Sequence, residues 1–319
     1  MGISEVSYTK VPTMKAIICQ RYGAPENLHL KELPKPNPKP GELLIRIKAG
    51  SVHIGDTRVR RADPFLVRLV FGLFKPKKNL VLGIEVSGII EALGAEVGNF
   101  KVGDEVFALT GFGMGGYAEY ITLPAIPKGN PEWKGLVNLK PSNLSFAEAA
   151  VMPAACLTVI QNFRKVKVEA GQSLLINGAS GSLGTYAIQI AKHLGLSVTA
   201  VCSAGNKDLV MRLGADEHID YQSQNFLETE QQFDVVYDAV LKSSRKKCRA
   251  ILKPQGVYLN NYGLPRTRIE DLEQVRAWAE SGVVKPVMDR SYDWSEVIEG
   301  HRYVDQGHKK GNVSLIIAE

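Results

Sequence analysis

The chain of 319 residues contains no CxxC pair, because its four cysteines, Cys19, Cys156, Cys202 and Cys248, stand singly and far apart. This arrangement indicates neither a disulfide framework nor a closed zinc site. Isolated cysteines usually behave as small buried hydrophobic residues. We therefore expect four free buried thiols, a reducing compartment and a cytoplasmic location.

The sequence also has no apolar run of the roughly 20 residues needed to cross a bilayer, and residues 1–13 lack the apolar centre of a secretory signal. We expect no membrane partner, and an N-terminal extension at 1–13. The net charge of +6 and the pI of about 9.0 are modest for this length, and basic and acidic residues alternate. A nucleic-acid partner is therefore not expected.

What the chain does contain divides into two patterns. From Met14 to Leu139, short apolar segments alternate with Gly and Pro, and in the run 43–48 every odd position is apolar. This pattern is typical of half-buried strands in an antiparallel barrel or sandwich. Ser145 and Glu148 then occupy the positions of a capping box, which predicts a helix in residues 145–163.

After residue 172, strand-like and helix-like segments alternate, which predicts an α/β fold with a doubly wound parallel sheet. The expected strands are 173–177, 197–202, 218–220, 233–240 and 256–261, and the expected helices are 181–195 and 206–214. From Arg266 we expect one more helix, at 270–282, and a final strand, at 312–319, that return to the β-rich domain.

A glycine-rich loop carries the strongest chemical signal, because it joins an apolar strand to an amphipathic helix. Its backbone N–H groups and the positive end of the helix suit a dinucleotide pyrophosphate, although the spacing is GxxGxxG rather than GxGxxG. A plain tight turn is the alternative. The expected cofactor-binding residues of the loop are Gly178, Ala179, Ser180, Gly181, Ser182, Leu183 and Gly184.

The end of the second strand of this sheet distinguishes NAD from NADP, since a carboxylate there accepts hydrogen bonds from the ribose hydroxyls of NAD. This chain has no carboxylate there before Asp208. Ser203, Asn206 and Lys207 are suited to a 2′-phosphate, so we predict NADPH as the cofactor. The alternative is that Lys207 is only a solvated residue at the start of a helix.

Taken together, a set of motifs resembles the quinone oxidoreductase (zeta-crystallin-like) branch of the medium-chain dehydrogenase/reductase superfamily, which does not use zinc. The motifs are GSVHIGDTRVRR, LGIEVSGIIEALG, FKVGDEVFAL, GGYAEY, LTVIQNF, INGASGSLG, RLGADEHIDY, FDVVYDAV, and KPVMDRSY with HRYVDQGHKKGNVSLII, which contains KKGN. The resemblance implies a GroES-like catalytic domain (14–143 and 266–319), a Rossmann cofactor-binding domain (144–265), and a cleft between them for nicotinamide and substrate.

Zinc-using relatives have a cysteine where this chain has His53 and a histidine where it has Ile84. His53 with Glu85 does not make the three-ligand site of a catalytic zinc, so we expect no metal. Zinc-independent relatives usually have Asn at the position of His53. We therefore consider His53 as a catalytic residue that orients a substrate carbonyl or donates a proton. The alternative is a hydrogen-bonded wall residue.

The resemblance also implies roles for four further residues. Thr158 is expected to pack beside the nicotinamide as a catalytic-site residue, unless its hydroxyl only bonds an upstream helix carbonyl. Tyr221 resembles a residue near the adenosine phosphate, with plain strand packing as the alternative. Val240 and Tyr262 are expected to line the nicotinamide pocket.

Two departures from the family pattern concern the same region. Leu241 stands where the family has Gly, close to the expected nicotinamide. Relatives also have a further strand and helix where this chain passes through YGLPRTRI after Asn261. The missing segment contributes the sheet edge through which relatives dimerise, so a homodimer stays an open alternative.

We therefore predict an NADPH-dependent reductase of quinones, enones or similar hydrophobic electrophiles, acting without zinc. A cofactor-binding sensor or scaffold with little turnover is one alternative. RNA binding through the basic cluster of Arg245, Lys246, Lys247 and Arg249 is a weaker one, because no aromatic stacking platform accompanies it. The apolar stretch from Asp63 to Lys78 is expected to be a pocket entrance or a core helix.

Overall fold

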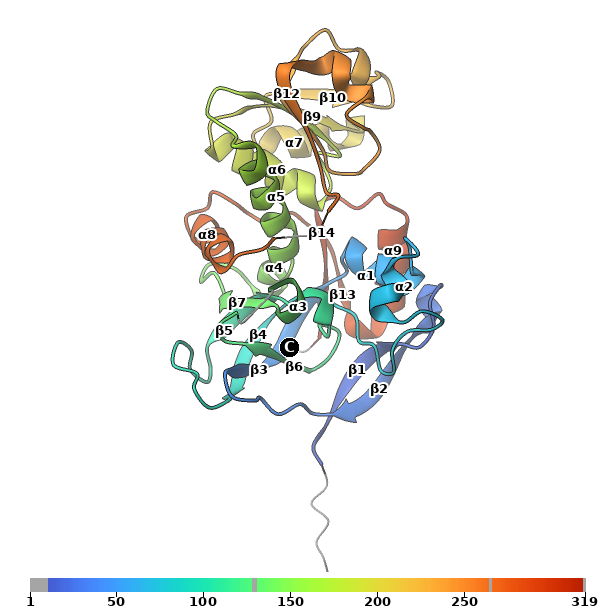
Figure 1. Cartoon of the computed structure of the whole chain (residues 1–319), viewed down its shortest axis with the longest axis vertical. Coiled ribbons are helices and arrows are strands. Elements are labelled where there is room, and N and C mark those ends of the chain that lie inside the picture. Colours follow the sequence, from blue (N-terminus) through green and yellow to red (C-terminus); the bar gives the residue numbers. More distant parts are fainter. Residues whose placement is uncertain (1–10, 128–130, 264–265, 318–319) are drawn as a thin grey trace, which may run out of the picture.

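The computed structural model describes residues 11–127, 131–263 and 266–317. The chain forms two lobes stacked along the long axis of the molecule, a parallel α/β lobe above and a β-rich lobe below (Figure 1). Most of the expected extension at 1–13 lies outside the described residues, and the first strand begins at Thr13. The predicted fold class, a Rossmann sheet beside a GroES-like β lobe, is confirmed.

The upper lobe is built on five parallel strands in the order β10-β9-β8-β11-β12. Their bounds are β8 Ser173–Asn177, β9 Ser197–Cys202, β10 Glu217–Asp220, β11 Phe233–Asp238 and β12 Leu252–Asn260. In the central strand β8, Leu174, Leu175 and Ile176 are completely buried. A strand that is covered on both faces has a continuous apolar sequence. The bounds of β8 could therefore be predicted from the sequence. Helices α6 (Ser182–His193) and α7 (Lys207–Arg212) connect the strands.

The segment 145–163 is two helices rather than one. The predicted capping box is present, with Ser145 Oγ accepting from the Glu148 amide and the Glu148 side chain accepting from the Ser145 amide. It begins α4 (Phe146–Ala150). Pro153 then starts α5 (Pro153–Val166), because proline has no N–H to donate and fits only the first turn of a helix.

The lower lobe contains a seven-stranded sheet in the order β13-β14-β3-β4-β5-β7, with β6 also paired to β3, and a separate β1–β2 hairpin. The bounds are β1 Thr13–Cys19, β2 Leu28–Pro34, β3 Glu42–Ser51, β4 Glu85–Leu93, β5 Glu105–Leu109, β6 Tyr120–Pro124, β7 Leu136–Leu139, β13 Met288–Asp293 and β14 Asn312–Ile316. Strand β14 pairs antiparallel with β3. The predicted return of the C-terminal strand to the β-rich lobe is confirmed.

The helix α8 (Ile269–Glu280) lies between the lobes and does not belong to the lower one alone. Its Leu272 and Val275 are buried in a core that joins the upper lobe to β5 and β7, and its Asp271 receives a hydrogen bond of 2.6 Å from Arg164 of α5. It also packs against β7. The expectation that this helix returns to the β-rich domain is therefore only partly right.

The outer edge of the parallel sheet is β12. Within the described residues the sheet has five strands, and none pairs with the free side of β12. Among the described residues between Asn260 and the start of α8 at Ile269 there is no further strand or helix. The predicted absence of the extra strand–helix unit is confirmed for the described residues, and the dimer that this edge serves in relatives stays untested.

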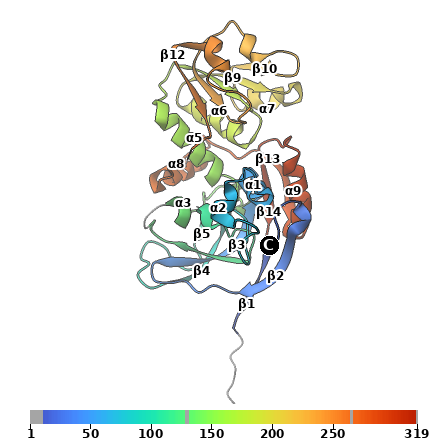
Figure 2. The same ribbon diagram turned by 45° about the vertical axis from the view of Figure 1, so that its right-hand side comes forward.

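Three helices lie together on one side of the lower lobe: α1 (Ile54–Arg61), α2 (Val67–Phe71) and α9 (Val297–Asp305) (Figures 1 and 2). Only α2 lies within the apolar stretch 63–78, and most large apolar side chains of that stretch are exposed. The core-helix alternative for this stretch is wrong. All four cysteines are free and buried, as predicted. Among the described residues, no helix has the length and hydropathy of a membrane span.

Candidate active site

The glycine-rich loop joins β8 to α6 at the carboxyl end of the parallel sheet. A Cβ on Gly184 would lie 2.3 Å from the Gly178 carbonyl oxygen. Gly178 has a φ of 84°, and a Cβ at this position would collide with the Val240 side chain. Gly181 is the N-cap of α6, and Thr185 is the first residue whose amide bonds back to it. The amides of the first helical turn are therefore free for an anion, as a pyrophosphate site requires.

The other residues of the glycine-rich loop are held in place by contacts with the rest of the fold. Ala179 is completely buried and its amide donates to the Val201 carbonyl. Leu183 packs against the core of the upper lobe, whereas the hydroxyls of Ser180 and Ser182 point to other elements described below.

Four predicted cofactor-binding residues follow directly on the carboxyl ends of strands: Ser203 after β9, Tyr221 after β10, Val240 after β11 and Tyr262 after β12. Carboxyl ends of parallel strands lie at one edge of a sheet, where open α/β folds bind ligands. Tyr221 is 52%, Val240 43% and Tyr262 70% exposed. The structure therefore brings these residues to one accessible edge beside the glycine loop, and excludes plain core packing for Tyr221.

Asn206 connects the two parts of this edge. Its Nδ2 donates to Ser180 Oγ and Ser203 Oγ, each at 3.1 Å, whereas its buried Oδ1 has no partner among the described residues. An unpaired buried polar atom is unusual and suits a ligand. If the amide is turned over, the serine hydroxyls donate to Oδ1 and Nδ2 becomes the free donor. Asn206 thus fits either a ribose hydroxyl or a phosphate, with the exposed Lys207 next to it.

The C-terminal segment of the lower lobe docks on the glycine loop, which sequence reasoning missed. The Gly311 amide donates to the Ser180 carbonyl at 2.8 Å, and Ser182 Oγ donates to Asn312 Oδ1 at 2.5 Å. Gly311 has a φ of 67°, and a Cβ there would lie 2.3 Å from the Val287 carbonyl. The only available signal was the glycine of the KKGN motif.

Lys309, two residues before Gly311, is the second residue that the sequence did not single out. Its Nζ donates to the Gly311 carbonyl at 2.5 Å. Burial lowers the pKa of this ammonium from its usual 10.5 to about 8, against the opposing effects of Glu85 and Asp289. A lysine with this pKa titrates close to neutral pH and is able to exchange a proton there.

His53 is the N-cap of α1, and its Nδ1 accepts a hydrogen bond of 3.0 Å from the Gly55 amide. Burial, with the charges of Lys309 and Arg58, lowers the pKa of His53 to about 3. The imidazole is therefore neutral at physiological pH, and because Nδ1 is an acceptor, its proton is on Nε2. His53 is a hydrogen-bonded residue, as the alternative reading held, but Nε2–H has no partner among the described residues and stays available.

Glu85 occupies the same region from β4. One carboxylate oxygen accepts from Ser51 Oγ at 2.6 Å and the other from the Ala154 amide at 2.8 Å. Burial raises the pKa of Glu85 to about 7, although these hydrogen bonds and the charge of Lys309 oppose the rise. The charge of Lys309 thus acts on the pKa of both His53 and Glu85.

The capping box of α1 connects His53 to a buried chain of hydrogen bonds. Asp56 accepts from the amides of His53 (3.1 Å) and Gly83 (2.9 Å), and it also hydrogen-bonds the Tyr117 hydroxyl. Burial raises the pKa of Asp56 to about 7. The backbone that carries His53 is therefore held by a carboxyl group with no exposed surface.

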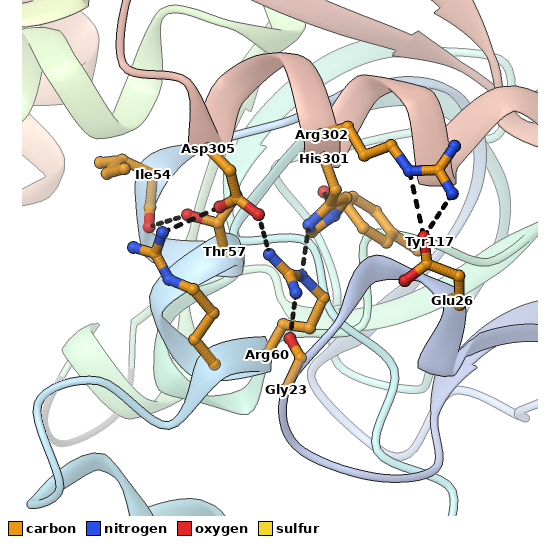
Figure 3. Close-up of polar contacts among 10 residues, drawn as sticks. Gly23, Glu26, Ile54, Thr57, Arg60, Tyr117, His301, Arg302 and Asp305 are labelled. Atoms are coloured by element: carbon orange, nitrogen blue, oxygen red, sulfur yellow. Dashed lines mark hydrogen bonds and ion pairs between the residues drawn. The ribbon is translucent and has the colours of Figure 1, made fainter.

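Figure 3 shows where this chain leads. Tyr117 Oη lies 3.1 Å from His301 Nε2, and Arg60 Nε donates to His301 Nδ1 at 3.2 Å. Because His301 Nδ1 accepts, the proton of the neutral ring is on Nε2 and is donated to Tyr117, whose own proton is then free for Asp56. Arg60 also bonds the Gly23 carbonyl and pairs with Asp305. The order of donation is thus Arg60, His301, Tyr117, Asp56.

The two other residues expected near the nicotinamide show local constraints. Thr158 Oγ1 donates to the Ala154 carbonyl four residues upstream at 2.7 Å, as the alternative reading proposed. Leu241 has a φ of 59°, a left-handed conformation that costs a residue with a Cβ roughly 1–2 kcal/mol. The family glycine at this position is therefore explained by backbone conformation.

No group of three or more His, Cys, Asp or Glu side chains in the described ranges is placed to hold a metal ion. The basic cluster at 245–249 is exposed.

Two family models match the chain: the alcohol dehydrogenase GroES-like domain over residues 39–128 and the zinc-binding dehydrogenase over residues 182–299. A 2-methylene-furan-3-one reductase of Solanum lycopersicum is 33% identical, over 95% of this chain and 79% of the relative. An NADPH-dependent alkenal/one oxidoreductase of Arabidopsis thaliana, chloroplastic, is 30% identical, over 94% and 78%.

Among solved structures, the quinone oxidoreductase from Coxiella burnetii superposes with a TM-score of 0.82 at 25% identity, over 96% of this chain and all of the other. The two lobes, the glycine loop at their junction and these similarities lead to one assignment: the chain is an oxidoreductase of the medium-chain dehydrogenase/reductase superfamily and belongs to its quinone oxidoreductase branch.

Proposed function

We propose that the chain is an NADPH-dependent reductase of quinones and α,β-unsaturated carbonyl compounds that acts without zinc. The observation that carries the proposal is the joint placement of the glycine loop, the strand-end residues and the group of His53, Glu85 and Lys309. The names of two relatives, an alkenal/one oxidoreductase and a quinone oxidoreductase, support this class of substrate.

The residues present fit a nicotinamide dinucleotide. Gly178–Gly184 would hold the pyrophosphate on the first turn of α6. Ser203, Asn206 and Lys207 would hold the ribose and its 2′-phosphate, with Tyr221 beside the adenosine. Val240, Tyr262 and Thr158 would line the nicotinamide. When bound, this cofactor supplies the hydride.

His53 and Lys309 have different roles in the proposal. The neutral imidazole is a poor acid, but its free Nε2–H is a suitable donor to a substrate carbonyl oxygen. The Lys309 ammonium, with its pKa near 8, supplies the positive charge and the proton that an enolate or hydroquinone oxygen needs after hydride arrives at carbon. Lys309 thus replaces His53 as the proposed proton donor.

In zinc-dependent relatives the metal polarises the substrate. In this proposal His53 and Lys309 polarise the substrate instead, so the reaction requires no zinc. Activity that survives dialysis against a strong chelator is expected. Loss of activity that added zinc restores would contradict this part of the proposal.

The first experiment measures thermal unfolding of the protein alone, with NADPH and with NADH, and then oxidation of NADPH with an ortho-quinone and a simple enone. Saturation at about one hundred times the dissociation constant stabilises by about 2.7 kcal/mol. We expect stabilisation by NADPH above NADH, and turnover on adding an acceptor.

The cytoplasmic location also stays a prediction, since some relatives are named as chloroplastic or mitochondrial.

Leu241 supports a second candidate, a cofactor-binding protein with little turnover, because its side chain stands where relatives have none. Stabilisation by NADPH without oxidation by any acceptor would favour that candidate. Stabilisation by neither nucleotide would reject both.

A further inference from the structure

An exposed apolar surface lies on the lower lobe, remote from the glycine loop in sequence. It is formed by the segment Asp63–Lys78, which contains α2. Its exposed large apolar side chains are Phe65 (64% exposed), Leu66 (67%), Leu69 (67%), Leu73 (45%) and Phe74 (89%). Monomeric proteins rarely expose so many large apolar groups together, and such a cluster marks an interaction surface.

The segment is anchored, so the exposed side chains are presented by an ordered support. Phe71 is buried in the core of the lower lobe, and the Tyr22 hydroxyl donates to the Gly72 carbonyl at 2.8 Å. The Arg68 guanidinium lies 4.9 Å from the Tyr22 ring centroid and 5.6 Å from that of Phe65, and it donates to the Leu73 carbonyl at 3.3 Å. Arg68 therefore connects both ends of the apolar surface.

The charge of the segment that carries this surface is mostly positive. Between Arg58 and Asn79 the chain has seven basic residues and one acidic residue, Asp63. Two of the seven, Arg60 and Arg61, pair with Asp305. Lys75, Lys77 and Lys78 are exposed directly beside Phe74.

A groove of about 540 Å³ lies at the edge of the apolar surface. Its lining contains three basic residues and no acidic one: Gln20, Arg21, Tyr22, Arg68, Phe74 and Lys75. Cations with aromatic walls form a site for a single anionic group such as a phosphate.

We propose that the segment Asp63–Lys78 docks the protein on an anionic lipid bilayer. The apolar side chains enter the boundary between headgroups and acyl chains, the exposed lysines meet the negative surface, and the groove takes a lipid headgroup phosphate. Interfacial binding of this kind combines apolar insertion with basic residues and needs no membrane-spanning helix. The absence of a spanning helix, on which we based the expectation of no membrane partner, does not bear on it.

The charge pattern favours a bilayer over two other occupants. A second copy of the chain in a symmetric contact would bring the same lysines together, which costs energy. A nucleic acid would meet the lysines, but it offers no apolar phase for Leu66, Leu69 and Leu73.

The test is co-sedimentation of the full chain, without cofactor, with vesicles of phosphatidylcholine alone and with phosphatidylserine added. We expect binding to the anionic vesicles, weakened by salt. Phe74→Ser should lower the partition coefficient more than tenfold, and Lys75→Gln about fivefold. Both side chains are exposed, so thermal unfolding should not change.

Val102→Ser and Lys101→Gln are the matched controls, because they lie exposed in the turn before β5 and should leave partitioning unchanged. Binding to neither vesicle, or equal binding by the Phe74→Ser and wild-type proteins, would overturn the proposal. So would a dimer in light scattering that Phe74→Ser dissociates, or tighter binding to single-stranded RNA than to anionic vesicles. Because no nucleotide is present, the result is independent of the proposed enzyme activity.

Discussion

At the scale of single residues, Lys309 is the least expected member of the site. Its ammonium is protonated below its pKa of about 8 and neutral above it, so a step that needs its proton slows as pH rises through 8. We expect kcat of the wild-type protein to fall across this range. Lys309→Arg should keep the charge and move the fall to higher pH, and Lys309→Met should give a low rate at every pH.

Lys310→Met is the matched control, since that neighbouring side chain is exposed and its substitution should leave the pH profile unchanged. An unaltered profile in Lys309→Met, with NADPH still bound, would remove Lys309 from the mechanism.

Leu241 allows a test of backbone strain. Leu241→Gly relieves a left-handed φ of 59°, worth about 1–2 kcal/mol, against the roughly 0.5–1 kcal/mol that glycine costs through the unfolded chain. We expect unchanged or slightly higher stability in urea unfolding, and faster NADPH oxidation. Leu66→Gly, at a φ of −58° and an exposed position, should instead lose about 0.5–1 kcal/mol. Equal losses in the two variants would contradict the strain argument.

At the scale of elements, the glycine loop contains a matched pair of positions. A Cβ on Gly184 would lie 2.3 Å from a backbone oxygen, whereas one on Gly181 would have its nearest neighbour at 3.5 Å. Gly184→Ala should therefore cost roughly 1–3 kcal/mol of stability through overpacking. Gly181→Ala should cost less, about 0.5 kcal/mol through the N-cap of α6, and should weaken NADPH binding, which isothermal titration would measure.

The sequence predicts an element well when neighbouring residues determine where that element begins and ends. The strands β8 and β9 were located at their observed bounds because buried parallel strands are continuous apolar runs, and the start of α4 because Ser145 and Glu148 cap it locally. The break at Pro153 was missed although its cause is local, because proline fits only the first turn of a helix. The bridging position of α8 was missed because it depends on contacts with the other lobe that no local pattern contains.

The same distinction applies to the site. The glycine loop and the strand-end residues were found because their spacing along one sheet determines where they lie. Lys309, Gly311 and Asn312 come from the other lobe, and only the packing of β14 brings them to the loop. The apolar segment 63–78 has the composition of a core helix, and its exposure is a property of the tertiary fold alone.

At the scale of the whole molecule, four buried groups contribute to the response to acid in opposite directions. Burial lowers the pKa of His53 and His301 to about 3 and raises those of Asp56 and Glu85 to about 7. Between about pH 4.5 and 6.5, unfolding lets the two histidines gain protons and the two acids lose them. The two effects oppose each other, so these groups should leave the free energy of unfolding nearly independent of pH there.

Removing one histidine should unbalance this compensation. His301→Gln keeps an acceptor for Arg60 and a donor for Tyr117 but cannot gain a proton on unfolding. Relative to the wild-type protein, its free energy of unfolding should rise by up to about 1.4 kcal/mol for each pH unit lowered from 6.5 to 4.5. Urea unfolding at several pH values measures the slope, and parallel curves for the two proteins would show that His301 is not held neutral.

The pairing of β14 with β3 determines the order in which the protein folds during synthesis. Ser51 pairs with Ser314, and Arg60 finds His301 and Asp305 only near the end of the chain. At about 5–20 residues per second, β3 waits roughly 10–50 s after leaving the ribosome for its partner. The upper sheet, whose last strand β12 ends at Asn260, is complete roughly 3–11 s before β14. The lobe that is translated first is therefore finished last, and the edge of β3 at Ala49–Ser51, which waits for β14, is where a chaperone has most to protect.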